Sequence, residues 1–277
     1  MPVIEHSQLR YDEIKPLIGA VVRAQKRALL SGGHAANLME LLEHCGVIVF
    51  PEAGLTEAEL IAFTGTLGDY ASDAADGSAT RISIDPATSS NADFTRVSFF
   101  WHFDGYMNPV PIRGSIMCAK VLSDEGGLTE FCNTYAAWAA LPDERKRQIE
   151  GLKAVHAHAA AARALEPEPS HARFLEWQSV KSSTLPLVWT HRSGRKSLVI
   201  GNTAAGIVGM DPLESLELLV WLRDWATQER FTYRHKWSMG DCVMWDNTGT
   251  LHRALPYDPA SGRLLTRTKL AGEESFA

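Results

Sequence analysis

The feature that most constrains this chain is a succession of short apolar runs separated by turn-forming residues. Runs rich in Val, Ile, Phe and Trp and bounded by Gly, Pro, Asn or Asp are typical of β-strands. Many short strands, with helices gathered at the front of the chain and in inserts, favour a layered β architecture. The sequence therefore predicts a mainly β core, with strands at residues 47–50, 81–84, 96–104, 112–122, 153–158, 185–191, 197–200, 231–237, 241–245 and 263–270.

Helices are expected to flank this core. Thr56 followed by Glu59 forms a capping-box pattern, so a helix is predicted to start at Thr56. Leucines at helical spacing predict another helix before Gly46, which is expected to end it. No Pro-, Gly- or Ser-rich linker divides the chain, so residues 1–277 are predicted to form one domain. The expected helices span residues 35–43, 56–67, 136–150 (two short ones), 159–165 and 211–228.

Composition argues against several classes of protein. The 27 Lys and Arg and 33 Asp and Glu give a net charge of −6, so no nucleic-acid partner is expected. Hydrophobic residues make up 45% of the chain, which is typical of a globular protein rather than a disordered one. No secretory signal or membrane span is visible, which predicts a cytoplasmic protein without a membrane partner. The four cysteines form no CxxC pair, so neither a disulfide framework nor a thiolate zinc site is expected.

Two potential metal ligands stand close together in an aromatic stretch. His102 and Asp104 are two residues apart on a predicted strand, so both side chains should point to the same face. His252, which follows the turn-prone pair Asp246-Asn247, is the natural third ligand, although taken alone it also fits a surface histidine. Two imidazoles and one carboxylate are typical of a facial metal site with open coordination positions.

Two arginines follow near the end of the chain. Arg263 and Arg267 lie four apart on a predicted strand and should share a face. A guanidinium binds a carboxylate through two parallel hydrogen bonds, so the pair fits an anion site. Solvent-facing charges on an edge strand are the alternative reading of these arginines taken alone.

Taken in order, these elements resemble the TauD/TfdA family of Fe(II)- and 2-oxoglutarate-dependent dioxygenases. The resemblance covers residues 45–272 and rests on His102-Phe103-Asp104, Gly126-Gly127-Leu128-Thr129, Trp245-Asp246-Asn247, His252 and Arg263. It implies a double-stranded β-helix, or jelly roll, in which His102, Asp104 and His252 bind iron. It further implies that Thr129 and Arg263 bind the distal carboxylate of 2-oxoglutarate, and that Arg267 binds an acidic group of the substrate. Phe103 departs from the family pattern, which commonly has Thr or Ser there.

The resemblance also implies the reaction. O2 and 2-oxoglutarate would be consumed, succinate and CO2 released, and an unactivated C–H bond oxidised, most simply by hydroxylation. Aromatic surroundings and Arg267 indicate a small hydrophobic substrate that carries an anionic group. Ser98, Tyr106 and Asn108 are expected to line its pocket. Residues 71–93 and 159–183 are expected to form lids over it.

Two other functions stay open at this point. A β-helix metal hydrolase or isomerase without 2-oxoglutarate would use the same three ligands, but Arg263 and Thr129 argue against it. A non-enzymatic binding protein would not need an intact ligand set. His156 and His158 form a second strand-spaced pair that becomes a rival only if His102 and Asp104 fail. The substrate, and whether the chain forms a homo-oligomer, are left open.

Overall fold

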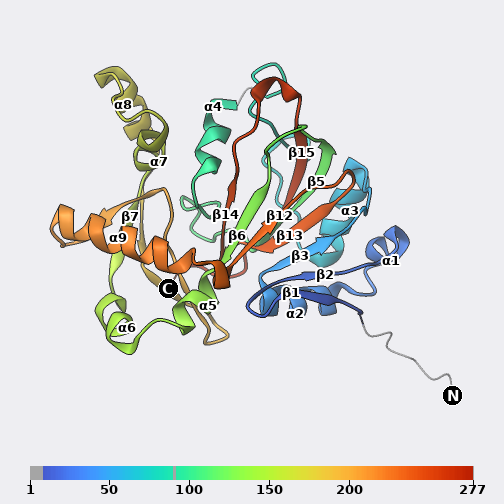
Figure 1. Cartoon of the computed structure of the whole chain (residues 1–277), viewed down its shortest axis with the longest axis horizontal. Coiled ribbons are helices and arrows are strands. Elements are labelled where there is room, and N and C mark those ends of the chain that lie inside the picture. Colours follow the sequence, from blue (N-terminus) through green and yellow to red (C-terminus); the bar gives the residue numbers. More distant parts are fainter. Residues whose placement is uncertain (1–8, 90–91, 277) are drawn as a thin grey trace.

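The structure, a computed structural model, describes residues 9–89 and 92–276. Its larger sheet has seven strands in the order β1-β2-β3-β13-β5-β15-β4, with helices beside it (Figure 1). Neighbouring strands of this sheet are antiparallel, except that β2 and β3 are parallel. The strands are β1 (Asp12–Lys15), β2 (Ile18–Val21), β3 (Val47–Phe50), β13 (Cys242–Asp246), β5 (Gly114–Val121), β15 (Leu264–Leu270) and β4 (Thr80–Ile82).

A second, three-stranded sheet packs against the first. Its order is β12-β6-β14, and it comprises β12 (Thr232–His235), β6 (Thr129–Asn133) and β14 (Thr250–Ala254). Phe131 of β6 lies 5.6 Å from Trp245 of β13, measured between ring centroids, in a buried layer between the sheets. Because strand residues alternate between faces, Val47 and Val49 join this layer, whereas Ile48 and Phe50 face the other way.

Helices cover the opposite face of the larger sheet. They are α1 (Lys26–Leu30), α2 (Ala35–Cys45) and α3 (Glu57–Leu67). The leucines of α2 and α3 pack on Ile48 and Phe50 of β3. The predicted caps are confirmed: Thr56 and Glu59 form the capping box of α3, and Gly46 ends α2 in the left-handed conformation at φ 73°.

The chain between β6 and β12 forms a helical layer with short strands, at the left of Figure 1. Its hydrophobic cluster continues into β6 and β14 through Cys132 and Leu251, so it shares the core of the β layers. Its elements are α5 (Thr134–Ala139), α6 (Asp143–Ile149), β7 (Lys153–His156), α7 (His158–Leu165), α8 (His171–Ser179), β8 (Ser183–Pro186), β9 (Val188–Thr190), β10 (Lys196–Leu198), β11 (Ala204–Ile207) and α9 (Pro212–Ala226).

The strand predicted over residues 96–104 is wrong. The chain forms α4 (Ala92–Thr95) and a 3-10 turn, Arg96–Phe99, before it extends. Only His102 pairs as in a sheet, through an isolated bridge with His252. The apolar run resembles a strand because Trp101 and Phe103 are buried. These rings pack on Arg253 of β14 and His156 of β7 although their own backbone forms no strand.

The expectation of no disulfide is also corrected. Cys118 of β5 and Cys242 of β13 lie directly opposite each other on adjacent strands and are joined by a disulfide. The two residues are 124 positions apart in the sequence, so no local spacing could indicate the pair. Cys45 and Cys132 are free and buried.

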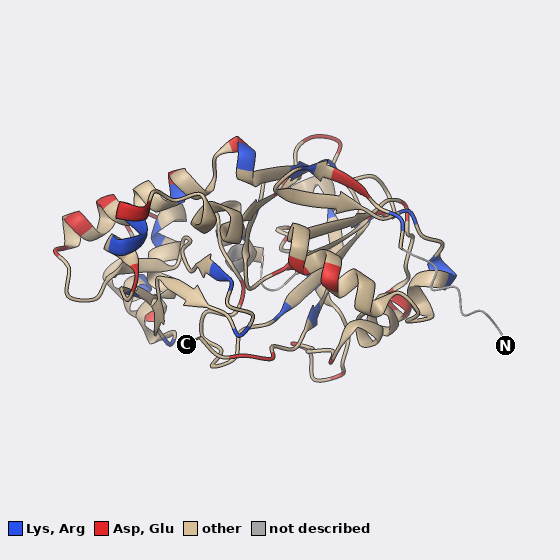
Figure 2. Cartoon of the chain, turned by 90° about the horizontal axis from the view of Figure 1, so that it is seen from below, with Lys and Arg blue, Asp and Glu red and all other residues tan. Residues whose placement is uncertain are grey.

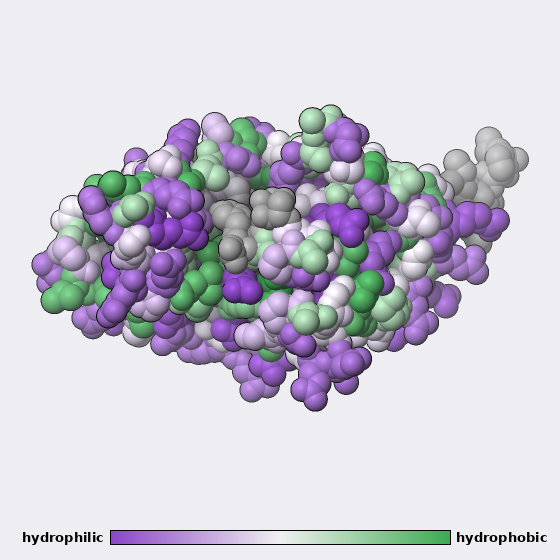
Figure 3. All heavy atoms as spheres, turned by 90° about the horizontal axis from the view of Figure 1, so that it is seen from above, coloured by the Kyte–Doolittle hydropathy of each residue, from purple (hydrophilic) through white to green (hydrophobic). Residues whose placement is uncertain are grey.

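Residues of both charge signs occur toward both ends of the molecule (Figure 2). On the face shown in Figure 3, hydrophobic residues are interspersed among hydrophilic ones. Among the described residues, every helix falls short of the length and apolar character that a bilayer crossing requires.

Candidate active site

The three predicted metal ligands meet where the two sheets approach each other. His252 lies on β14, and the backbone bridge to His102 brings the two imidazoles to a centroid distance of 4.1 Å. Asp104 Oδ1 is 3.9 Å from His102 Nε2, and Asp104 Oδ2 is 3.7 Å from His252 Nε2. All three potential ligand atoms lie within 4.8 Å of one another, so one ion can contact them together.

The protonation of this cluster suits a divalent cation. His102 Nδ1 donates to the carbonyl of Phe100 at 2.9 Å, which leaves Nε2 unprotonated on the side of Asp104. Burial lowers the pKa of His102, and it lowers the pKa of His252 further, so both imidazoles are neutral. Burial opposes ionisation of Asp104, but the guanidinium of Arg267 holds its pKa below the ordinary value. Two neutral imidazoles and a carboxylate fit Fe(II).

Asn247 fixes the backbone of Asp104. Its side-chain oxygen accepts from the Asp104 amide at 2.8 Å, and its amide group donates to the Asp104 carbonyl at 2.9 Å. The same amide donates to the carbonyl of Ile112 at 3.2 Å. In the sequence Asn247 is recognisable only as a turn former, and this role was missed. Its position between a buried strand and His252 was the only sequence feature that could have indicated a role at the metal site.

One cavity of about 400 Å³ joins all the predicted site residues. Its walls include the three potential ligands, Thr129, Arg263, Arg267, and the predicted substrate contacts Ser98, Tyr106 and Asn108. Apolar side chains, among them Val97, Met117 and Leu265, form much of the remaining wall. Asp73 and Ile82 from residues 71–93, and Ala161 from residues 159–183, also line it.

Arg263 is a buried cation, 2% exposed. Its Nη2 donates to the carbonyl of Gly127 at 2.7 Å, and its guanidinium lies 4.5 Å from the centre of the Tyr257 ring. Among the residues that the structure describes, no carboxylate forms an ion pair with it. A Cβ at Gly127 would lie 2.7 Å from Arg263 Nε, so a side chain there would displace the guanidinium. This close approach explains why a glycine occupies position 127, the second of the Gly-Gly element.

Thr129 and Arg267 complete the polar wall. Thr129 Oγ1 accepts from Trp237 Nε1 at 3.0 Å, which leaves its hydroxyl proton available to the cavity. Arg267 Nη1 donates to Asp104 Oδ2 at 2.7 Å. The buried Nε of Arg267 has no hydrogen-bond partner among the described residues. Since Arg267 lines the cavity and Asp104 uses one of its five N–H donors, the guanidinium has further donors for a bound molecule.

The alternative pair His156 and His158 does not join the metal cluster formed by the described residues. His156 is fully buried, and its Nδ1 lies 2.8 Å from Thr203 Oγ1. Its ring also packs edge-on against Phe103, at 5.4 Å between centroids. His158 lines the cavity from α7.

The chain belongs to a dioxygenase family. The family model described as "Taurine catabolism dioxygenase TauD, TfdA family" matches residues 10–269. The chain is 32% identical over 279 residues to the (S)-phenoxypropionate/alpha-ketoglutarate-dioxygenase of Sphingobium herbicidovorans, covering 94% of this chain and 95% of that protein. It is also 32% identical over 278 residues to the alpha-ketoglutarate-dependent 2,4-dichlorophenoxyacetate dioxygenase of Cupriavidus pinatubonensis, covering 92% and 94%.

A solved structure agrees with this assignment. The structure titled AAD-2 in complex with Mn(II) and N-oxalylglycine has a TM-score of 0.86 and is 29% identical, covering 97% of this chain and 99% of that one. The prediction that the chain is a TauD/TfdA-type enzyme is confirmed.

Proposed function

We propose that this chain hydroxylates an unactivated C–H bond of a small, hydrophobic, anionic molecule. The chain is a 2-oxoglutarate-dependent dioxygenase, with Fe(II) as cofactor and 2-oxoglutarate and O2 as cosubstrates. Succinate and CO2 are the coproducts of this reaction. The observation that carries the proposal is one cavity holding the His102, Asp104 and His252 cluster together with two arginines. The two packed sheets around it fit a jelly-roll core.

His102, Asp104 and His252 would hold the iron. Three protein ligands leave coordination positions open, as a metal centre that binds a cosubstrate and O2 requires. When bound, Fe(II) activates O2 for the oxidation, and the chain's residues orient the reacting groups and exclude water. The neutral imidazoles and the ionised carboxylate are set before the metal arrives, by burial and by Arg267.

Arg263 and Thr129 would bind the distal carboxylate of 2-oxoglutarate. A buried cation is costly unless an anion neutralises it. That no described carboxylate pairs with Arg263 supports the carboxylate of the cosubstrate as its partner. The Thr129 hydroxyl, which already accepts from Trp237, can donate to the same carboxylate.

Arg267 would bind the acidic group of the substrate. A guanidinium offers five donors, so Arg267 can keep its bond to Asp104 and still donate from another N–H group to a second carboxylate in the cavity. The apolar wall of Val97, Met117 and Leu265 would contact the hydrophobic body. Two relatives named for phenoxypropionate and 2,4-dichlorophenoxyacetate support the same class, a ring joined to a carboxylate. Ser98, Tyr106 and Asn108 are proposed as further substrate contacts.

Two segments are proposed as lids. Residues 71–93 contribute Asp73 to the cavity wall, where it is paired with Lys269. Residues 159–183 contribute Ala161, on α7. Both segments would separate the bound substrate from water.

The experiment is a screen of hydrophobic acids by succinate release, with Fe(II), 2-oxoglutarate and O2 supplied. Aryloxyalkanoates and other hydrophobic carboxylates should accelerate succinate formation, and the matched amides or methyl esters should not. Acceleration by the neutral compounds alone would contradict the proposed substrate class. Mass spectrometry of the products then identifies hydroxylation by the gain of one oxygen atom. Where the hydroxyl forms on the carbon that bears an ether oxygen, the ether breaks, and the added oxygen appears in the oxo acid released together with the phenol.

A further inference from the structure

Phe103 stands between two of the proposed metal ligands and is held from both sides. Its ring contacts His156 at 5.4 Å and Phe276 at 6.2 Å, measured between centroids, in both cases nearly edge to face. The side chain is 8% exposed. A displacement of the Phe103 backbone also displaces His102 and Asp104, because the three residues are consecutive.

Phe276 belongs to residues 271–276, which follow β15. Its ring also packs on Trp189, a buried residue of β9, with ring centroids 4.6 Å apart. Near the start of this segment, a Cβ on Gly272 would lie 1.9 Å from the carbonyl oxygen of Pro111. The backbone there is packed too closely for a side chain, so the course of the segment is fixed.

Glu274 anchors this segment two residues before Phe276. Its carboxylate accepts from His191 Nδ1 at 2.6 Å and from the backbone amide of Arg192 at 3.0 Å. His191 Nε2 lies 2.8 Å from Ser197 Oγ. The Glu274 side chain is only 19% exposed, so these bonds are largely shielded from water.

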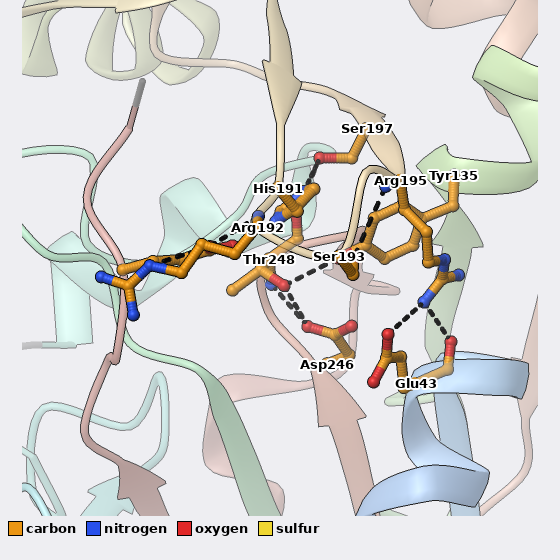
Figure 4. Close-up of polar contacts among 10 residues, drawn as sticks. Glu43, Tyr135, His191, Arg192, Ser193, Arg195, Ser197, Asp246 and Thr248 are labelled. Atoms are coloured by element: carbon orange, nitrogen blue, oxygen red, sulfur yellow. Dashed lines mark hydrogen bonds and ion pairs between the residues drawn. The ribbon is translucent and has the colours of Figure 1, made fainter.

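Hydrogen bonds connect His191 and Ser197 to the turn that follows β13, where Asp246 and Thr248 lie (Figure 4). Ser197 Oγ donates to the carbonyl of Thr248 at 2.9 Å. Thr248 donates to Asp246 Oδ1 from its backbone amide at 2.8 Å and from its hydroxyl at 2.6 Å. Asn247, between these two residues, holds the backbone of Asp104.

We propose that Glu274 and Phe276 are positioning residues for the metal centre. They brace the ligand pair by two routes: through the ring of Phe276 onto Phe103, and through His191, Ser197 and Thr248 to the turn that carries Asn247. This inference rests on the proposed metal site. Neither residue lines the cavity itself, so their effect should reach the metal and not the substrate contacts.

The experiment measures Co(II) binding to the full chain by calorimetry and by the visible absorption of the bound ion. Variants are Phe276→Ala, Phe276→Leu and Glu274→Gln. Glu273→Gln is the matched control, because Glu273 pairs with Arg113 and does not reach Phe103.

Removing a group that orients a metal ligand typically weakens metal affinity about 10- to 100-fold. We expect a loss of about 10-fold for Phe276→Ala and Glu274→Gln. Phe276→Leu should lose less, and Glu273→Gln should bind as the wild type does.

If the wild type does not bind Co(II), the proposed metal site fails, and the inference fails with it. If the wild type binds and the Phe276→Ala and Glu274→Gln variants bind equally tightly, the inference is overturned and the metal site stands. If Glu273→Gln loses as much affinity as Glu274→Gln, the effect is a general one of the segment, and the inference is again overturned. Should Phe276→Ala fail to fold, Phe276→Leu and Glu274→Gln decide the matter.

Discussion

Arg267 donates from Nη1 to Oδ2 of Asp104 over 2.7 Å, so the proposed substrate anchor and a proposed metal ligand share one charged hydrogen bond. The bond keeps the carboxylate ionised in a buried place. It also uses one N–H donor of Arg267 and leaves other donors of the guanidinium, which lines the cavity, for a bound anion. An acidic substrate that binds this arginine would therefore be placed beside the metal.

Replacing Arg267 should weaken substrate binding selectively. Arg267→Gln is expected to raise the KM for an acidic substrate about 10- to 100-fold, because a hydrogen bond to a charged group contributes about 1.5–3 kcal/mol. Because Arg267 also bonds Asp104, both constants are measured at saturating Fe(II), where the KM for the cosubstrate should stay near the wild-type value, since Arg263 is unchanged. Steady-state succinate formation measures both constants. An equal rise in both would place Arg267 in the cosubstrate site instead.

Replacing Arg263 should have the opposite selectivity. In Arg263→Gln the buried counter-charge for the cosubstrate is lost, and we expect the KM for that cosubstrate to rise about 10- to 100-fold. Arg253→Gln serves as the control, because Arg253 pairs with Glu130. Unchanged affinity for 2-oxoglutarate in Arg263→Gln, measured by calorimetry on the metal-loaded protein, would refute this assignment.

Asn247→Ala should weaken metal binding, although Asn247 is not itself a proposed metal ligand. The backbone amide and carbonyl of Asp104 would lose their partners, and a group that orients a metal ligand typically contributes about 10-fold or more to metal affinity. We expect Co(II) to bind correspondingly more weakly to Asn247→Ala. Asn247→Asp discriminates further, since a carboxylate can accept from the Asp104 amide but cannot donate to its carbonyl. Wild-type affinity in both variants would show that Asp104 is held by other contacts.

His156 should make the fold less stable in mild acid. Burial lowers the pKa of His156 from 6.5 to about 4, so the unfolded chain binds a proton that the folded chain does not. Its stabilising contribution is complete above the unfolded pKa and is lost as pH falls from 6.5 toward 4. At about pH 5 this single group lowers the free energy of unfolding by about 2 kcal/mol, since each pH unit below the unfolded pKa contributes about 1.4 kcal/mol.

Urea unfolding at about pH 7 and about pH 5 tests this, with Phe as a ring of similar shape that cannot titrate. His156→Phe should lose about 2 kcal/mol less than the wild type between the two pH values. Other buried histidines, such as His191, keep part of the pH dependence in both proteins. Identical pH dependence in the two proteins would mean that His156 is not buried as a neutral ring.

The candidate ligands could be predicted from the sequence because the combination of His102, Asp104, His252 and Arg263 in this order is specific, although each motif alone is not. So could the caps of α2 and α3, since Thr56, Glu59 and Gly46 act within one turn. The prediction failed over residues 96–104, where Trp101 and Phe103 are buried but the backbone joins a sheet only through the isolated bridge at His102. The roles of Asn247, Glu274 and Phe276 depend on partners distant in the chain, as does the Cys118–Cys242 disulfide. No local pattern encodes such contacts.

The most direct test is an anaerobic titration of the metal-free protein with Fe(II) and then 2-oxoglutarate, observed in the visible region. We expect a weak charge-transfer band when 2-oxoglutarate chelates the bound iron. Asp104→Ala should abolish the band, and Arg263→Ala should shift it to higher cosubstrate concentrations. Iron binding without any band in the wild type would contradict the proposed site, and a metal enzyme that does not use 2-oxoglutarate would take its place.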